Sequence, residues 1–485
     1  MSLDVQRRGV DCARPKTGQE TRFWWAADWP RVGWPVAVAL STGLGVLVAL
    51  HAMVALLVIG LPLVLMVRMP EGRAGLFVLG SMLTLGSAGA LSSAKPVYFA
   101  FVTASALYST YFLLDRDRPV SRTARIALTG SGLIATLTFA AALRGLAEVA
   151  PVTYVVRDGF TYWLIACAVP VGLECGERVS RRFILTLAVV SSSFGAASFA
   201  VHFLSTRGVG LLSIDQLGLP SMMILAFGVP FALVKGGGRL HLRPLWLAWG
   251  FFLIACVLVT GTRTGFVLFA GFVGVLGSTR SGGINARRLV LVLAAGLLLV
   301  VFGAKPLVDA VASPGFYESR VAAMQTVLSS GVSADQSGGM RQRALEIGLS
   351  AWHSSEFFGV GLGHVFESPA AGVAPALFQV DTPSLYLAKF GVFGLVLLLA
   401  GIVVVVGPLL RWRIEFGPES GEVVHIARGA VCIWLATSAF GAITEDKGFA
   451  LGLMLIVMLS ANSNRARCDA SSNPRGVAQE KTAMA

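Results

Sequence analysis

Residues 384–408 read SLYLAKFGVFGLVLLLAGIVVVVGP, an almost wholly apolar run in which Lys389 is the one charged residue. A helix needs about 20 mainly apolar residues to cross the hydrocarbon core of a bilayer, so this run is long enough to span it. Similar runs recur along the 485-residue chain, which is 55% hydrophobic and only 13% charged. Soluble domains carry about 25% charged residues. The sequence therefore predicts an all-α polytopic membrane protein.

Fourteen runs qualify as candidate spans, and because several are short we expect about 12–14 transmembrane helices. They lie near 34–50, 52–67, 75–93, 97–114, 126–143, 160–175, 183–204, 219–234, 245–260, 264–278, 289–304, 384–408, 429–444 and 448–461.

The distribution of basic residues predicts the orientation of these spans. With the N-terminus in the cytoplasm, 28 of the 39 lysines and arginines fall on the cytoplasmic side, as the positive-inside rule requires. One long segment then lies outside. The predicted organisation is a cytoplasmic tail, a first set of spans, a periplasmic loop with short helices, further spans and a second cytoplasmic tail: 1–33, 34–304, 305–383, 384–461 and 462–485.

Inside the outer loop, residues 339–363 read GMRQRALEIGLSAWHSSEFFGVGLG. The spacing of Arg341, Leu345, Leu349 and Trp352 predicts a helix over 340–355 with this face against the membrane domain. Arg343 has Glu346 three residues on, which favours a surface pair. Arg341 has no such local partner, so it either binds an anion or caps a helix end.

Three glycines, Gly359, Gly361 and Gly363, end this stretch and allow the backbone to approach another group closely. The pattern is compatible with phosphate binding or with a tight re-entry turn. No strand precedes it and no helix opens from it, so a dinucleotide fold is excluded.

A second arginine, Arg263, stands in LVTGTRTGFVLF at the outer end of two apolar runs. It either reaches the interface or marks a functional site. Arg263 and the long loop fall on the same predicted side, so Arg263 and Arg341 can converge on one diphosphate. Arginine suits this ligand because its planar fork binds phosphate oxygens in pairs and stays charged.

These motifs resemble the Wzy-type polysaccharide polymerase and O-antigen ligase superfamily. TGTRTG stands where the family has Ser-x-Ser-Arg-Gly, and Arg341 lies eighteen residues before the Gly-x-Gly that begins at Gly359. VDTPSLYLAKFGVFGL resembles the family's His-Asn-x-Tyr-Leu and Gly-x-x-Gly. The chain departs from the pattern at Asp381, which stands in the region of the family's histidine. This departure favours a polymerase over a ligase.

The resemblance implies an inverting, metal-independent glycosyltransferase of the bacterial inner membrane, with no cofactor and with both termini cytoplasmic. The donor would be a glycan on undecaprenyl diphosphate, and the acceptor a lipid-linked repeat or lipid A–core. A chain-length regulator is a possible partner, besides membrane lipids. Arg263 and Arg341 would bind the diphosphate at the periplasmic face.

Several residues are candidates for the rest of the site. Asp381 and then His364 are candidate general bases, although Asp381 also suits a helix cap and His364 a plain surface position. Four further residues are candidates for lining the same cavity: Arg343, Arg207, His202 and Lys389. Lys389 alternatively snorkels outward to the interface or contacts an anionic lipid headgroup.

Other classes of function fit less well. The six cysteines form no CxxC pair, so neither disulfides nor a metal site is expected. The basic residues are scattered among short loops, which does not indicate nucleic-acid binding. A polysaccharide or lipid transporter remains an alternative of another class, but we find no mirrored halves and the arginines lie at the outer edge. A cell-wall glycan polymerase of the elongation type has a similar plan, but its aspartate motif is not evident.

Overall fold

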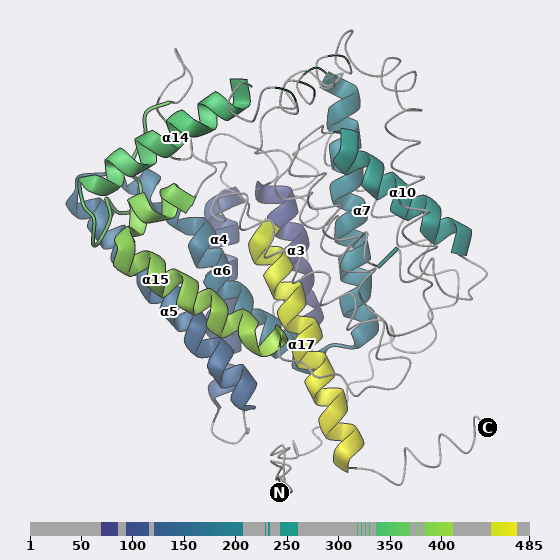
Figure 1. Cartoon of the computed structure of the whole chain (residues 1–485). Helices are drawn as coiled ribbons and strands as arrows, with labels where there is room; N and C mark the ends of the chain where they lie inside the picture. The colour runs from purple at the N-terminus through teal and green to yellow at the C-terminus, as the bar shows by residue number, and fades with distance from the viewer. Residues whose placement is uncertain are drawn as a thin grey trace, which may run out of the picture.

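The computed structural model describes residues 69–85, 94–115, 121–206, 243–259, 336–368, 383–410 and 448–472, together with a few single positions between them. These residues form helices and short connections, and no strand occurs among them. The helices in chain order (Figure 1) are α3 (Pro70–Leu85), α4 (Ala94–Leu114), α5 (Arg122–Ala147), α6 (Val152–Arg178), α7 (Arg181–Thr206), α10 (Arg243–Val259), α14 (Gln336–His353), α15 (Pro383–Leu410) and α17 (Gly448–Ser472).

Eight predicted spans, from 75–93 to 448–461, overlap helices α3, α4, α5, α6, α7, α10, α15 and α17. Within the part of the chain that the structure describes, five helices are long and apolar enough to cross a membrane: Lys95–Leu114, Arg122–Ala147, Val152–Arg178, Arg181–Val201 and Ser384–Gly407. The all-helical class with membrane-spanning helices is confirmed to this extent. The other predicted spans, 34–50, 52–67, 219–234, 264–278, 289–304 and 429–444, lie wholly or almost wholly outside the described residues.

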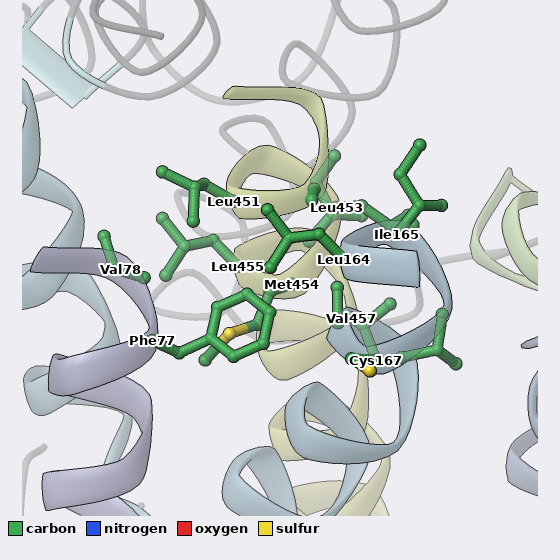
Figure 2. Close-up of a cluster of buried hydrophobic side chains, with 14 of the residues drawn as sticks. Phe77, Val78, Leu164, Ile165, Cys167, Leu451, Leu453, Met454, Leu455 and Val457 are labelled. Atoms are coloured by element: carbon green, nitrogen blue, oxygen red, sulfur yellow. The ribbon is translucent and has the colours of Figure 1, made fainter. Parts of the chain in front are cut away.

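Helix α6 is the centre of the described bundle. It is buried along most of its length and packs against α3, α4, α5 and α17 (Figure 1). A helix that is apolar on every side is expected in such a central position. Figure 2 shows where three helices meet: Phe77 of α3, Leu164 of α6 and Met454 of α17 lie in one apolar cluster.

Small residues let α6 and α17 approach closely. A Cβ on Gly172 would lie 3.0 Å from the Met454 carbonyl oxygen, and one on Gly176 would lie 2.5 Å from that of Met458. Close contacts of this kind are typical of helix packing in membranes, where van der Waals contact drives association.

The bundle has one polar end where α3 begins and α6 ends. Glu174 accepts hydrogen bonds from Arg73 at 2.5 and 2.6 Å and from Arg178 at 2.7 Å. Glu174 therefore has two cationic partners, Arg178 four residues on in α6 and the fully buried Arg73 of α3. Nearby, Asn462 of α17 donates to the Val179 carbonyl oxygen at 2.9 Å. The first turn of α3, the last turns of α6 and part of α17 therefore meet at this end.

The opposite end is formed by the end of α5, the start of α6 and the start of α15. Residues 354–366, which follow α14, fill the space between them, and α14 itself packs against α15 (Figure 1). This end carries the segment that the sequence singles out.

Candidate functional site

Helix α14 lies within the predicted outer loop and covers most of the helix expected over 340–355. Its packed face differs from the predicted one. Ala344 and Gly348 are buried, whereas Leu345 is 41% exposed. The reason is steric: a Cβ on Gly348 would lie 2.8 Å from the Ser384 hydroxyl oxygen, so the small residues define the face that meets α15. The prediction is therefore wrong at Leu345, whereas Trp352, on the same predicted face, is partly buried against the core.

The predicted pair between Arg343 and Glu346 is also wrong. Arg343 is exposed, and Glu346 instead accepts a hydrogen bond from Gln342 at 3.3 Å, one turn earlier. Arg341 is helical in α14, and its side chain lies outside the described part of the structure.

The glycine run of residues 359–363 is a docking turn, which we call the glycine turn. Gly359, Gly361 and Gly363 have φ values of 68°, 84° and 86°, a region that favours glycine. Val360 and Gly361 donate to α15, at the carbonyl oxygens of Ala388 (2.8 Å) and Lys389 (3.0 Å).

The remaining amides of the glycine turn are also bonded within the protein. Leu362 donates to the Ala141 carbonyl oxygen of α5 at 3.0 Å, and Gly359 donates to that of Ser355 at 2.8 Å. Gly363 donates to an Asp158 carboxylate oxygen at 2.9 Å. These amides already have acceptors within the protein, so they are not free to bind a phosphate. Of the two predicted readings, the segment is therefore a re-entry turn.

Arg144 joins the glycine turn to the end of α5, a role that the sequence did not indicate. Its Nε donates to the Gly359 carbonyl oxygen at 2.9 Å, and its Nη2 lies 3.2 Å from the Ser355 hydroxyl and 3.1 Å from Glu148. An arginine in the last turn of a helix with a glutamate four residues on is the signal that could have singled it out.

Helix α15 is broken at Gly391, where φ is 65° and ψ is −176°. The amides of Val392 and Phe393, freed by the break, donate to the carbonyl oxygens of Glu356 (3.0 Å) and Phe357 (3.2 Å). The short first part of α15 is therefore set at an angle to the long apolar part, and Lys389 is in this short part.

Lys389 forms a buried ion pair with Asp158 of α6. Its Nζ lies 2.5 Å from one carboxylate oxygen, and both side chains are fully buried. The predicted outward reach of Lys389 to the interface or to a lipid headgroup is wrong, because the lysine has a carboxylate partner in the interior. We missed Asp158, although an acid at the start of an apolar helix is itself a reason to expect a cation nearby.

His364 follows the glycine turn and is half-buried. Its ring meets the Phe366 ring edge-on, with centroids 4.8 Å apart, and the Lys389 Nζ lies 5.9 Å from the centroid of that same ring. Burial and, second, the lysine charge lower the pKa of His364 below its usual 6.5, while Asp158 and Glu148 oppose this shift. A neutral imidazole at neutral pH can accept a proton.

The structure thus brings two of the predicted residues together, His364 and Lys389, and leaves Arg343 on the exposed side of α14. The other candidates lie outside the described residues or have side chains that do: Asp381, Arg263, Arg207, His202 and Arg341. Across the described ranges, no group of three or more His, Cys, Asp or Glu side chains gathers as a metal site.

Comparison with known proteins adds no relative. No family model matches the chain, and no curated protein matches it.

Proposed function

We propose that this chain is a membrane-embedded glycosyltransferase that polymerises glycan repeats carried on undecaprenyl diphosphate, at the periplasmic face of the bacterial inner membrane. The observation that supports this best is that residues 354–366 are fixed against α5, α6 and α15 by backbone hydrogen bonds, Arg144 and Asp158. Transfer chemistry needs polar groups held on rigid elements, and this end of the bundle supplies them.

The proposed orientation places the α14 end in the periplasm. Arg73 and Arg178 lie at the opposite end, where α3 begins and α6 ends. Cytoplasmic ends of spans carry an excess of lysine and arginine, so this distribution supports a cytoplasmic position for the Arg73 end.

In the proposed reaction, an acceptor hydroxyl attacks the anomeric carbon of the donor sugar. The new glycosidic bond forms as the bond to the diphosphate oxygen breaks, and the leaving undecaprenyl diphosphate takes the electron pair. Arg263 and Arg341 stabilise the charge that develops on this diphosphate. Attack opposite to the leaving group inverts the configuration at the anomeric carbon.

His364 is one candidate for the base that removes the proton from the acceptor hydroxyl. Its lowered pKa supports this role, because a larger fraction of the imidazole is neutral at pH near 7 than in an exposed histidine. Asp381 is the other candidate base.

The test is a strain that lacks the gene, scored for capsule, free exopolysaccharide and lipopolysaccharide banding in the same cells. A polymerase predicts that the mutant retains single repeat units and loses long polymer, and that the intact gene restores it. Unchanged polymer in all three fractions would contradict the proposal.

The same measurement separates the related alternatives. Long polymer that is made but not attached to lipid A–core would indicate a ligase, in which the same arginines would serve a different acceptor. Lipid-linked repeats that accumulate on the cytoplasmic leaflet would indicate a transporter and would contradict transfer chemistry in this chain.

A further inference from the structure

Asp158 is bonded on both of its carboxylate oxygens, to two different segments of the chain. One oxygen lies 2.5 Å from the Lys389 Nζ in the short part of α15, and the other accepts the Gly363 amide at 2.9 Å. Gly363 directly precedes His364. The carboxylate therefore joins α6, α15 and the backbone that carries the histidine.

We propose that Asp158 and Lys389 are a buried positioning pair for His364, an inference that rests on the proposed role of this histidine as base. Asp158 fixes the backbone at Gly363, and Lys389 sets the electrostatic environment of the imidazole. Neither residue needs to touch the substrate.

The presence of a fully buried ion pair between Asp158 and Lys389 supports a positioning role rather than a purely structural one. Moving two ions out of water is costly, and apolar residues of similar volume often hold a fold as well or better. A purely structural contact between α6 and α15 would not require an ion pair. The lysine charge has a second effect that an apolar residue lacks, since it favours the neutral imidazole.

The charged groups that act on His364 come from each element around it. Lys389 of α15 lowers the pKa of the imidazole, after burial, which is the largest cause. Asp158 of α6 and Glu148, at the end of α5, raise it. Phe366 packs on the His364 ring and is itself near the lysine ammonium, so all of these groups share one site.

The experiment is histidine modification by diethyl pyrocarbonate, which reacts with neutral imidazole, followed by mass spectrometry of the purified full-length protein between about pH 5 and pH 8. The rate at the His364 peptide gives a plateau at high pH and a midpoint that reports the pKa. His353 is exposed and serves as an internal control for the reagent in every sample.

Lys389→Met removes the lysine charge and should raise the midpoint at His364. The effect of the lysine on the imidazole is larger than the opposing effect of Asp158, so the midpoint rises, by less, even where the Asp158 charge is removed as well. At about pH 6 the rate of His364 modification should be several-fold lower than in the wild-type protein, with the rate at the high-pH plateau unchanged. The double variant Asp158→Asn/Lys389→Met removes both buried charges and keeps the test open if the single variant does not fold.

Asp158→Ala tests the backbone contact separately. It should raise the plateau rate at His364 several-fold, because Gly363 loses its acceptor, whereas Asp158→Asn keeps an oxygen for this amide and should leave the plateau unchanged. Folded variants in which both midpoint and plateau at His364 stay the same would overturn the positioning role.

This readout requires no transfer activity. It therefore fails or succeeds independently of the proposed function, which is tested by polymer formation. If the midpoint shifts as expected but His364→Gln leaves polymer synthesis intact, the pair positions the histidine and the base assignment is wrong.

Discussion

Gly145 gives the sharpest test of how residues 359–363 are held. It is buried in α5 where Leu362 crosses the helix, and a Cβ there would overlap the Leu362 carbonyl oxygen and lie 3.1 Å from its amide nitrogen. Backbone atoms cannot move aside as a flexible side chain does. Gly145→Ala should therefore lift the glycine turn from α5.

The size of the effect follows from what the glycine turn loses. Leu362 is fully buried, and its exposure costs about 1.5–3 kcal/mol. Its hydrogen bond to Ala141 contributes about 1 kcal/mol net, and the better helix propensity of alanine returns about 1 kcal/mol. The last two terms cancel, so we expect local destabilisation of about 1.5–3 kcal/mol.

The assay is amide hydrogen exchange of the peptide that covers 359–363, whose five amides are all bonded within the protein. A local loss of about 1.5–3 kcal/mol corresponds to exchange about ten to a hundred times faster. Gly132→Ala is the matched control, because it lies on the same helix with nothing within 4 Å of the added methyl group. If Gly145→Ala left the protection of this peptide equal to that in Gly132→Ala, the docking described above would be refuted.

Three further predictions concern the kink, the opposite end of the bundle and the pH dependence. Gly391→Ala forces a positive φ on alanine, which should destabilise the protein by about 1–3 kcal/mol and lower its thermal midpoint in detergent. Gly407→Ala is the control, because nothing lies within 4 Å of the added methyl group. Equal thermal midpoints for the two variants would contradict this prediction. Glu174→Gln removes the carboxylate from the buried Arg73 and should destabilise the protein by about 3 kcal/mol, so an unchanged thermal midpoint would argue against the ion pair. If His364 is the base, it acts in its neutral form. Its lowered pKa then predicts that transfer activity in proteoliposomes persists as the pH falls below 6.5 and is lost only as the pH passes the lowered value. A loss of activity already complete above pH 6.5 would exclude this base.

The helical bundle could be predicted because its helices are long apolar runs, which can be recognised from the local sequence without knowing which helices pack against them. The predicted span at 160–175 nevertheless began too late, since α6 starts at Val152 and includes Asp158. A span that begins at residue 160 leaves Asp158 outside the apolar run, and nothing in the sequence around Lys389 indicates a buried carboxylate partner. An ion pair between residues more than 200 positions apart cannot be read from local pattern.

The contact face of α14 shows a different limit. The 3.6-residue spacing places Leu345 on the inward face, but the close approach to α15 selects small residues there, and Gly348 meets Ser384. Glu148, four residues on, is a local signal for Arg144, but its contact with the glycine turn could not be predicted, because the acceptor is a backbone oxygen of Gly359, which carries no sequence signature.

The proposed role of Arg341 in holding the donor diphosphate can be tested directly, and Arg343, two residues away, supplies the control. Both arginines lie in α14, and Arg343 is on its exposed side. The measurement is the amount of polymer in cells that carry Arg341→Ala or Arg343→Ala, with equal amounts of each protein in the membrane. We expect loss of polymer with Arg341→Ala and near-normal polymer with Arg343→Ala. Equal tolerance of both substitutions would contradict it.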